Sequence, residues 1–151
     1  MANPVCEVLV TNAQLNAAEN RVDPAAGARV DFQGIVRASE DGHEIEGIDY
    51  EAHWKMAEYQ LRQIAEQAIV QFELRSVIIH HRIGFVAVGE PSLMMRVFSG
   101  HRKAAFQASR WIVDELKKKV PIWKRPRFKI QNDMQPGSSL PATAAAPTTA
   151  K

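Results

Sequence analysis

Alternation of apolar and polar residues predicts a β-sheet in the first half of the chain. Val5 to Val10 is a short, mostly apolar run of the kind that forms strands. From Ala28 to Val36 the even positions are apolar or small and the odd positions are mostly polar, which predicts a half-buried strand. Ile45 to Ala52 is the expected returning strand. Leu74 to His80 is rich in β-branched residues, so we expect it in the centre of a sheet.

Two amphipathic helices are predicted. The first runs from Trp54 to Phe72, with an apolar residue at every third or fourth position. The second follows Ser99, a predicted N-cap because its hydroxyl can accept a hydrogen bond from a free N–H of the first turn. It ends at Val120, because Pro121 lacks an N–H and disfavours helical geometry in the residue before it. Its predicted core face consists of Ala105, Phe106, Ser109, Ile112, Val113 and Leu116.

The remaining segments predict turns and a tail. The polar run from Arg37 to Glu44 contains Asp-Gly and predicts a hairpin loop, and Phe85 to Val88 is expected to form a second hairpin with Leu93 to Phe98. Segregation of two long helices from antiparallel strands is typical of the α+β class. The end of the chain is rich in Pro, Ala, Thr and Ser. We therefore predict one folded domain, residues 1–134, and an unstructured tail, residues 135–151.

Composition narrows the classes of function. A chain of 151 residues with 46% hydrophobic and 24% charged residues is typical of a single soluble domain, and no apolar run is long enough to span a membrane. The net charge of +2 is too small to indicate a nucleic-acid partner. Cys6 is the single cysteine, which excludes an intrachain disulfide and favours a reducing, cytoplasmic location. We expect no metal and no cofactor: the sequence lacks a Gly-rich phosphate loop, and the adjacent His80 and His81 point to opposite faces of a strand.

The candidate chemistry is cationic. His101 and Arg102 begin the second helix, where free N–H groups and the helix dipole already favour an anion, so basic side chains there suggest that a negative ligand binds. Lys117 lies at the border of the buried helix face, Lys124 follows in a short segment after Pro121, and Arg37 ends a strand. Such a set suits a small molecule that carries phosphate. Residue types alone leave open a solvated helix with basic ends.

Several motifs favour a binding site over a solvated helix with basic ends. The chain contains H-R-K-A-A-F at 101–106, D-E-L-K at 114–117 and V-P-I-W-K-R at 120–125. At these spacings the segment resembles the catalytic (large) subunit of molybdopterin synthase. Upstream, F-Q-G-I-V-R at 32–37, Y-E-A-H at 50–53, H-H-R-I-G at 80–84 and V-G-E at 88–90 extend the resemblance to roughly residues 5–125. The resemblance implies an α+β fold of the α/β-hammerhead type.

The family resemblance also implies an activity and its partners. Molybdopterin synthase is a sulfurtransferase of molybdenum cofactor biosynthesis that inserts two sulfurs into cyclic pyranopterin monophosphate as a dithiolene. The sulfur arrives as a thiocarboxylate on the C-terminal Gly-Gly of a small ubiquitin-like subunit. Two large subunits form a dimer with a small subunit at each end, a heterotetramer whose sites can draw residues from both large subunits.

By motif match, the resemblance assigns roles to five residues. Lys117 and Lys124 fall on the catalytic lysines, and Arg37, His101 and Arg102 fall on the positions that bind the substrate phosphate. We assign general acid–base catalysis to Lys117 and polarisation of the thiocarboxylate carbonyl to Lys124.

One position departs from the family. Pro126 stands where the family usually has a glutamate after W-K-R or W-K-K. The lost carboxylate could have oriented a lysine or held the tail of the small subunit. The alternative reading is therefore a divergent, non-catalytic paralogue that binds the small subunit without turnover.

Overall fold

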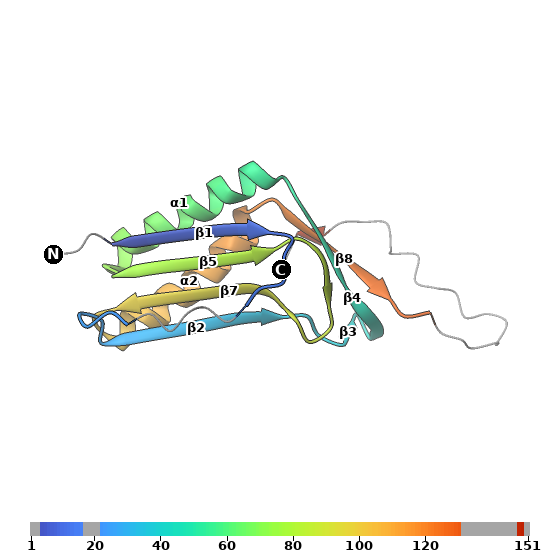
Figure 1. Cartoon of the computed structure of the whole chain (residues 1–151), viewed down its shortest axis with the longest axis horizontal. Coiled ribbons are helices and arrows are strands. Elements are labelled where there is room, and N and C mark those ends of the chain that lie inside the picture. The colour runs from blue at the N-terminus through green and yellow to red at the C-terminus, as the bar shows by residue number, and fades with distance from the viewer. Residues whose placement is uncertain (1–3, 17–21, 131–147, 150–151) are drawn as a thin grey trace.

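A mixed four-stranded sheet forms the larger part of the molecule (Figure 1). The computed structural model describes residues 4–16, 22–130 and 148–149. The strand order is β1-β5-β7-β2, with bounds Val5–Thr11, Ser76–Arg82, Pro91–Ser99 and Ala28–Ile35. β1 and β5 are parallel, and the β5–β7 and β7–β2 pairs are antiparallel. The prediction that Leu74 to His80 lies in the centre of a sheet is confirmed, because β5 lies between β1 and β7.

Both helices, α1 (Trp54–Phe72) and α2 (Arg102–Lys119), pack on one face of this sheet, behind it in Figure 1. The core lies between the helices and the sheet. Its largest fully buried side chains include Leu61, Ile64, Ile79, Val97 and Ile112. The predicted α+β class is thereby confirmed. No helix among the described residues has both the length and the apolar character needed to cross a membrane.

The beginning of α2 differs from the prediction. The N-cap is His101, and its side chain makes no capping hydrogen bond. Ser99 is the last residue of β7, and its hydroxyl accepts a hydrogen bond from the backbone N–H of His101 at 3.4 Å. The expectation of a Ser99 N-cap is therefore wrong, because the strand extends further than the apolar pattern indicated. The predicted helix end at Val120 is confirmed.

Phe106 does not belong to the core face of α2, although the helical spacing predicted that it would. Phe106 is 65% exposed, whereas Ile112 is fully buried between α2 and the sheet. Ile112→Ala should lower the free energy of unfolding by about 2–5 kcal/mol, because it removes methylene groups and leaves a cavity. Phe106→Ala should change it by less than about 0.5 kcal/mol. Denaturant titration of the two variants checks this; equal losses would contradict the observed face.

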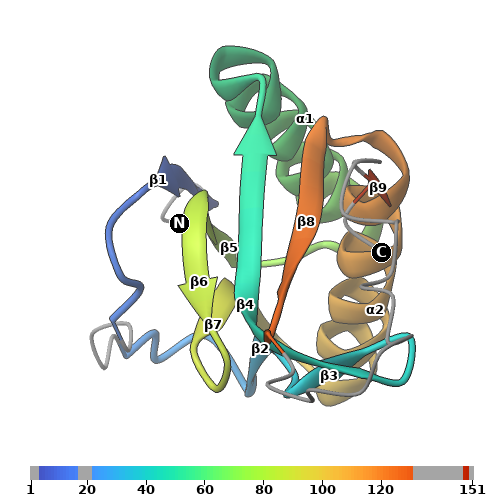
Figure 2. The ribbon, with the colours of Figure 1, turned by 90° about the vertical axis from the view of Figure 1, so that its right-hand side faces the viewer.

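A second sheet crosses the end of the first (Figure 2). Its central strand is β4 (His43–Ala52), flanked by β6 (Gly84–Ala87) and β8 (Ile122–Phe128). The predicted hairpin between the segments that became β6 and β7 is wrong. β6 pairs with β4, whereas β7 pairs with β5 and β2, so the turn after β6 carries the chain from one sheet to the other.

The Asp-Gly hairpin is confirmed. β3 (Ser39–Glu40) pairs with the beginning of β4, and the two turn residues, Asp41 and Gly42, have φ of 50° and 79°. Positive φ at both central positions is the geometry that Asp-Gly favours in a two-residue turn. The boundary at residue 134 and most of the predicted tail lie outside the described residues; Thr148–Thr149 form β9, which pairs with Trp123 and Lys124 of β8.

Candidate functional site

A cleft of about 300 Å³ lies where the end of the first sheet, the second sheet and the end of α2 meet. It contains Arg37, Lys117 and Lys124, three of the five residues assigned to the site by motif match. The rest of its wall mixes apolar and polar side chains, namely Phe32, Ile35, Val36, Ile48, Leu93, Glu40, Tyr50, His81 and Ser92, with Gly34 among them. Residues far apart in the sequence thus converge on one cationic cleft.

The helix end brings the two lysines together. Lys117 lies in the last turn of α2, where a cation complements the negative end of the helix dipole. The helix stops at Val120, and β8 begins at Ile122, so the chain turns back along the second sheet at once. Lys124 then lies directly opposite Tyr50 of β4 in the antiparallel register, on the same face of the sheet. The Lys124 side chain is only 17% exposed.

A carboxylate lies between two of the cations. The Glu40 carboxylate is 3.3 Å from Nζ of Lys124 and 3.9 Å from a guanidinium nitrogen of Arg37. The Arg37 side chain is 77% exposed, so most of its guanidinium faces the solvent at the mouth of the cleft. Motif matching did not select Glu40, because it lies in a polar hairpin and 84 residues from Lys124 in the sequence.

Tyr50 and His81 line the buried side of the cleft. Their rings meet edge to face, with 5.6 Å between the centroids. Nδ1 of His81 lies 2.8 Å from the carbonyl oxygen of Arg82, to which it donates. Burial raises the pKa of the Tyr50 hydroxyl, an effect that a hydrogen bond with Ser92 partly offsets. Burial also lowers the pKa of His81 to about 4, so this imidazole is neutral at neutral pH. The Y-E-A-H and H-H-R-I-G motifs pointed to both residues without giving them a role.

The neutral His81 gives stability a defined pH dependence. In the unfolded chain a histidine binds a proton near its ordinary pKa of 6.5, whereas folded His81 does so only near 4. The unfolded state therefore binds more protons in this window, and stability falls as the pH drops from 6.5 towards 4. We expect His81 to account for a loss of about 2 kcal/mol between pH 7 and pH 5. Denaturant titration of His81→Gln should show that part of the slope removed; an unchanged slope would contradict it.

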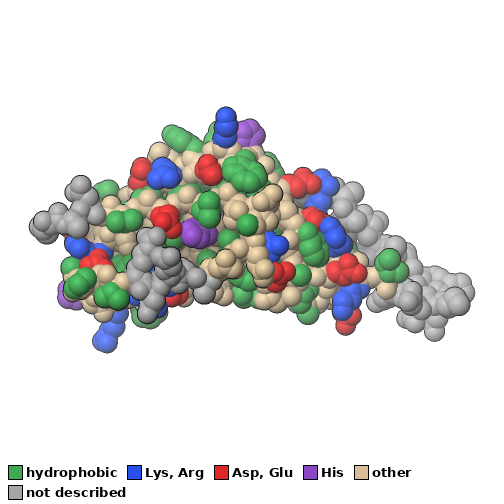
Figure 3. Space-filling model, viewed as in Figure 1, with side chains coloured by type: hydrophobic (Ala, Val, Ile, Leu, Met, Phe, Trp, Pro, Cys, Tyr) green, Lys and Arg blue, Asp and Glu red, His purple; other side chains and the backbone are tan. Residues whose placement is uncertain are grey.

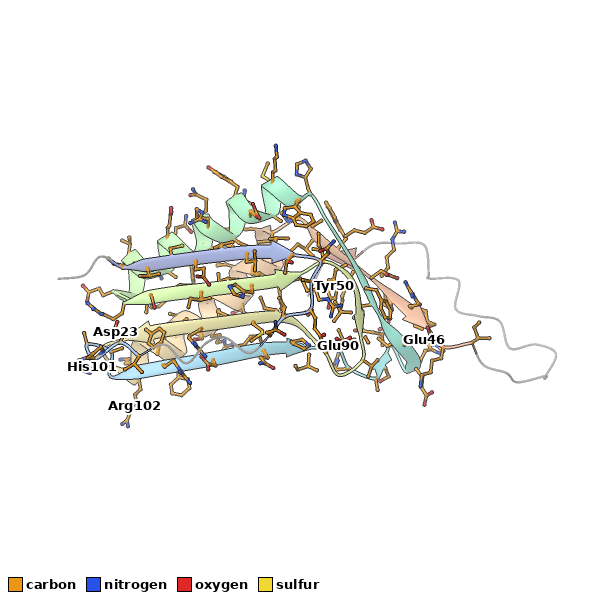
Figure 4. All side chains as sticks on the ribbon, in the orientation of Figure 1. Asp23, Glu46, Tyr50, Glu90, His101 and Arg102 are labelled. Carbon is orange, nitrogen blue, oxygen red and sulfur yellow. The ribbon has the colours of Figure 1, made fainter. Side chains whose placement is uncertain are left out.

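His101 and Arg102 lie far from the cleft in the folded chain. Figure 4 shows both at one end of the first sheet, whereas Tyr50 lies near the other end. Arg102 begins α2 and Lys117 lies in its last turn, so a rise of 1.5 Å per residue separates them by about 22 Å. Both His101 and Arg102 are exposed. A single chain therefore does not bring these two residues to the cleft.

Comparison with known proteins identifies the family. Residues 9–119 match the family described as MoaE protein. The molybdopterin synthase catalytic subunit of Thermoplasma volcanium is 40% identical over 121 residues, which cover 78% of this chain and 88% of that protein. The chain belongs to the MoaE family. The resemblance drawn from the motifs is confirmed.

Solved structures agree with membership in the MoaE family. The crystal structure of molybdopterin synthase from Staphylococcus aureus superposes with a TM-score of 0.74 at 30% identity, covering 82% of this chain and 90% of that one. A chain from the Helicobacter pylori complex of subunits 1 and 2 of molybdopterin-converting factor has the same fold, with a TM-score of 0.60 at 18% identity over 85% of this chain and 92% of that one.

The cleft of this MoaE chain is suited to an organic anion. Its cations are lysine and arginine, and among residues 4–16, 22–130 and 148–149 no three His, Cys, Asp or Glu side chains gather as a metal site would require. Cys6 is half-buried, and burial raises the pKa of its thiol, which makes it a poor nucleophile. Figure 3 shows basic and acidic side chains interspersed over the face in view, without the continuous basic patch that nucleic acid would need.

Proposed function

We propose that this chain is the catalytic subunit of molybdopterin synthase, a sulfurtransferase that inserts two sulfurs into cyclic pyranopterin monophosphate to form the molybdopterin dithiolene. The observation that carries the proposal is the convergence of Arg37, Lys117 and Lys124 on one cleft. A volume of about 300 Å³ is in the range of pockets that hold small organic ligands. Membership in the MoaE family supports the same reaction.

Each cation has a role that its position suits. Arg37 stands exposed at the mouth of the cleft, where its forked guanidinium can hold the substrate phosphate. Lys124 is largely buried, and its ammonium can stabilise the negative charge that develops on the carbonyl oxygen when water adds to the carbon that carries the sulfur; the carbon–sulfur bond then breaks, which leaves the sulfur on the pterin and a carboxylate on the small subunit. Lys117 also lines the cleft, and it acts as general acid and base at the pterin carbons.

The proposed partner is a small ubiquitin-like subunit with a C-terminal Gly-Gly thiocarboxylate. Glycine residues lack side chains, so such a tail can enter a narrow cleft in an extended conformation. The complex from Helicobacter pylori, in which two subunits of molybdopterin-converting factor were solved together, supports a partner of this kind. We place the reaction in the cytoplasm, a prediction that rests on the sequence.

We also propose that two copies of this chain form a dimer with shared sites. His101 and Arg102 lie about 22 Å along α2 from Lys117, too far to touch the same small substrate within one chain. Both residues lie at the beginning of a helix, a position that suits an anion. Because both are exposed, they are available to a second subunit. In this arrangement they complete the phosphate site of the neighbouring subunit's cleft.

An in vitro assay tests the proposed function. The purified chain is mixed with the thiocarboxylated small subunit and cyclic pyranopterin monophosphate, and molybdopterin is measured as its fluorescent oxidised derivative. Product in the complete mixture, and none without the small subunit, is the expected result. Binding of the small subunit without product would instead indicate the non-catalytic paralogue.

A further inference from the structure

Glu40 is a carboxylate inside a cleft that otherwise suits an anion. Its side chain is only 15% exposed, and it lies 3.3 Å from Nζ of Lys124. A largely buried carboxylate is costly unless it is paired, and it repels a phosphate-bearing ligand. A role for Glu40 in binding the substrate therefore does not explain its position in the cleft. We propose that Glu40 is a positioning residue that holds the ammonium of Lys124 in its reactive orientation, an inference that rests on the proposed function.

The backbone holds the Glu40 carboxylate in place. Glu40 is the last residue of β3, immediately before the tight turn at Asp41 and Gly42, and it is paired with His43 in the hairpin. A backbone hydrogen bond of 3.0 Å from Ile45 to Ala38 closes the base of the same hairpin. Since a two-residue turn fixes the register of its strands, the carboxylate approaches the cleft from a defined direction.

The pair with Glu40 restricts the side chain of Lys124. A lysine side chain has four rotatable bonds and loses about 2 kcal/mol of rotamer free energy when it is held in one conformation. Lys124 projects from a strand into the cleft, and the pair with Glu40 supplies a charge-assisted hydrogen bond to its ammonium. Both partners are mostly buried, so solvent screens this pair less than it screens the exposed pairs of the same hairpin.

The inference predicts that loss of the Glu40 charge lowers turnover without weakening substrate binding. Glu40→Gln keeps the shape of the side chain and removes its charge. Turnover (kcat) should fall about tenfold or more, because the ammonium of Lys124 loses the negative charge of Glu40 that orients it. The KM for the pterin substrate should stay the same or decrease, because a negative charge has left an anion-binding cleft. A residue with only a structural role would not produce this split.

Glu44→Gln is the matched control. Glu44 belongs to the same hairpin, and its carboxylate pairs with Lys129 at 3.8 Å, outside the cleft. Its side chain is 76% exposed, so the substitution should leave both kcat and KM at wild-type values. Comparison of the two variants separates loss of a charge on the hairpin from loss of the charge beside Lys124.

The experiment measures kcat, KM and the melting temperature of wild type, Glu40→Gln, Glu40→Asp and Glu44→Gln with the thiocarboxylated small subunit. Glu40→Asp keeps the charge but shortens the side chain by one methylene, so an intermediate kcat at a wild-type melting temperature is expected. If Glu40→Gln does not fold, Glu40→Asp decides, and a wild-type kcat in that variant overturns the inference. A wild-type kcat in Glu40→Gln, or a loss of kcat/KM that arises from KM alone, also overturns it. Absence of product from wild type would instead refute the proposed function.

Discussion

Replacement of Lys117 by alanine is expected to lower molybdopterin formation by about two to four orders of magnitude, the usual effect of removing a general acid–base group. The fold should be unaffected. Lys117 is exposed at the end of α2, and no ion pair holds its ammonium among the residues that the structure describes, so the free energy of unfolding should change by less than about 0.5 kcal/mol. Lys124→Ala should lose comparable activity, with a larger cost in stability because the largely buried Glu40 loses the nearer of its two cationic partners.

Lys118→Ala is the control for Lys117→Ala. Lys118 is the next residue of the same helix turn and is equally basic, but it does not line the cleft. Turnover should therefore stay at the wild-type level, although the charge of the helix end is reduced by the same amount. Product formation is measured in the fluorescence assay and folding by thermal unfolding. Unchanged turnover in Lys117→Ala would remove the acid–base role from this residue.

Arg102→Ala and Lys117→Ala should complement each other when the two variants are mixed. Each variant alone is expected to be nearly inactive. In a mixed dimer the cleft of the Arg102→Ala subunit keeps Lys117, and the Lys117→Ala subunit supplies the intact Arg102 of that site. Free exchange of subunits makes half of the dimers mixed, each with one intact site out of two, so recovery of about a quarter of wild-type turnover is expected.

A second mixture shows whether the recovery depends on a site shared between subunits. Lys117→Ala and Lys124→Ala both change the cleft of their own subunit, so mixing these two variants should restore nothing. Turnover is measured after subunit exchange, and size-exclusion chromatography checks that dimers are present. If Arg102→Ala and Lys117→Ala also fail to recover, then Arg102 does not complete a neighbouring site.

Sequence patterns located the elements that depend on neighbouring residues. The periodicity between Trp54 and Phe72 predicted α1 with its observed bounds, and Pro121 marked the end of α2. Asp41-Gly42 marked a tight turn. These signals are reliable because helical spacing, proline geometry and positive φ act within a few residues.

These local patterns did not predict which distant segments pair with one another. β6 has the composition of a hairpin strand, yet it pairs with β4 and not with β7, because β5 and β2 occupy both edges of β7, whereas β4 offers the edge that β8 does not use. Phe106 fitted the helical period of α2, but the core face of that helix centres on Ile112, and Phe106 faces the solvent. Burial depends on which face of a helix meets the sheet, and that contact involves residues far away in the sequence.

The sequence by itself determined the family, the residue types of the site and the presence of Arg37, Lys117 and Lys124 at motif positions. Only the tertiary structure decided that these three residues share a cleft, that Glu40 pairs with Lys124, and that His101 and Arg102 lie away from this cleft, at the other end of the first sheet. The physical reason is that residue chemistry and helix or turn signals are local. The charge around a functional group depends on side chains that only long-range packing brings within a few ångströms.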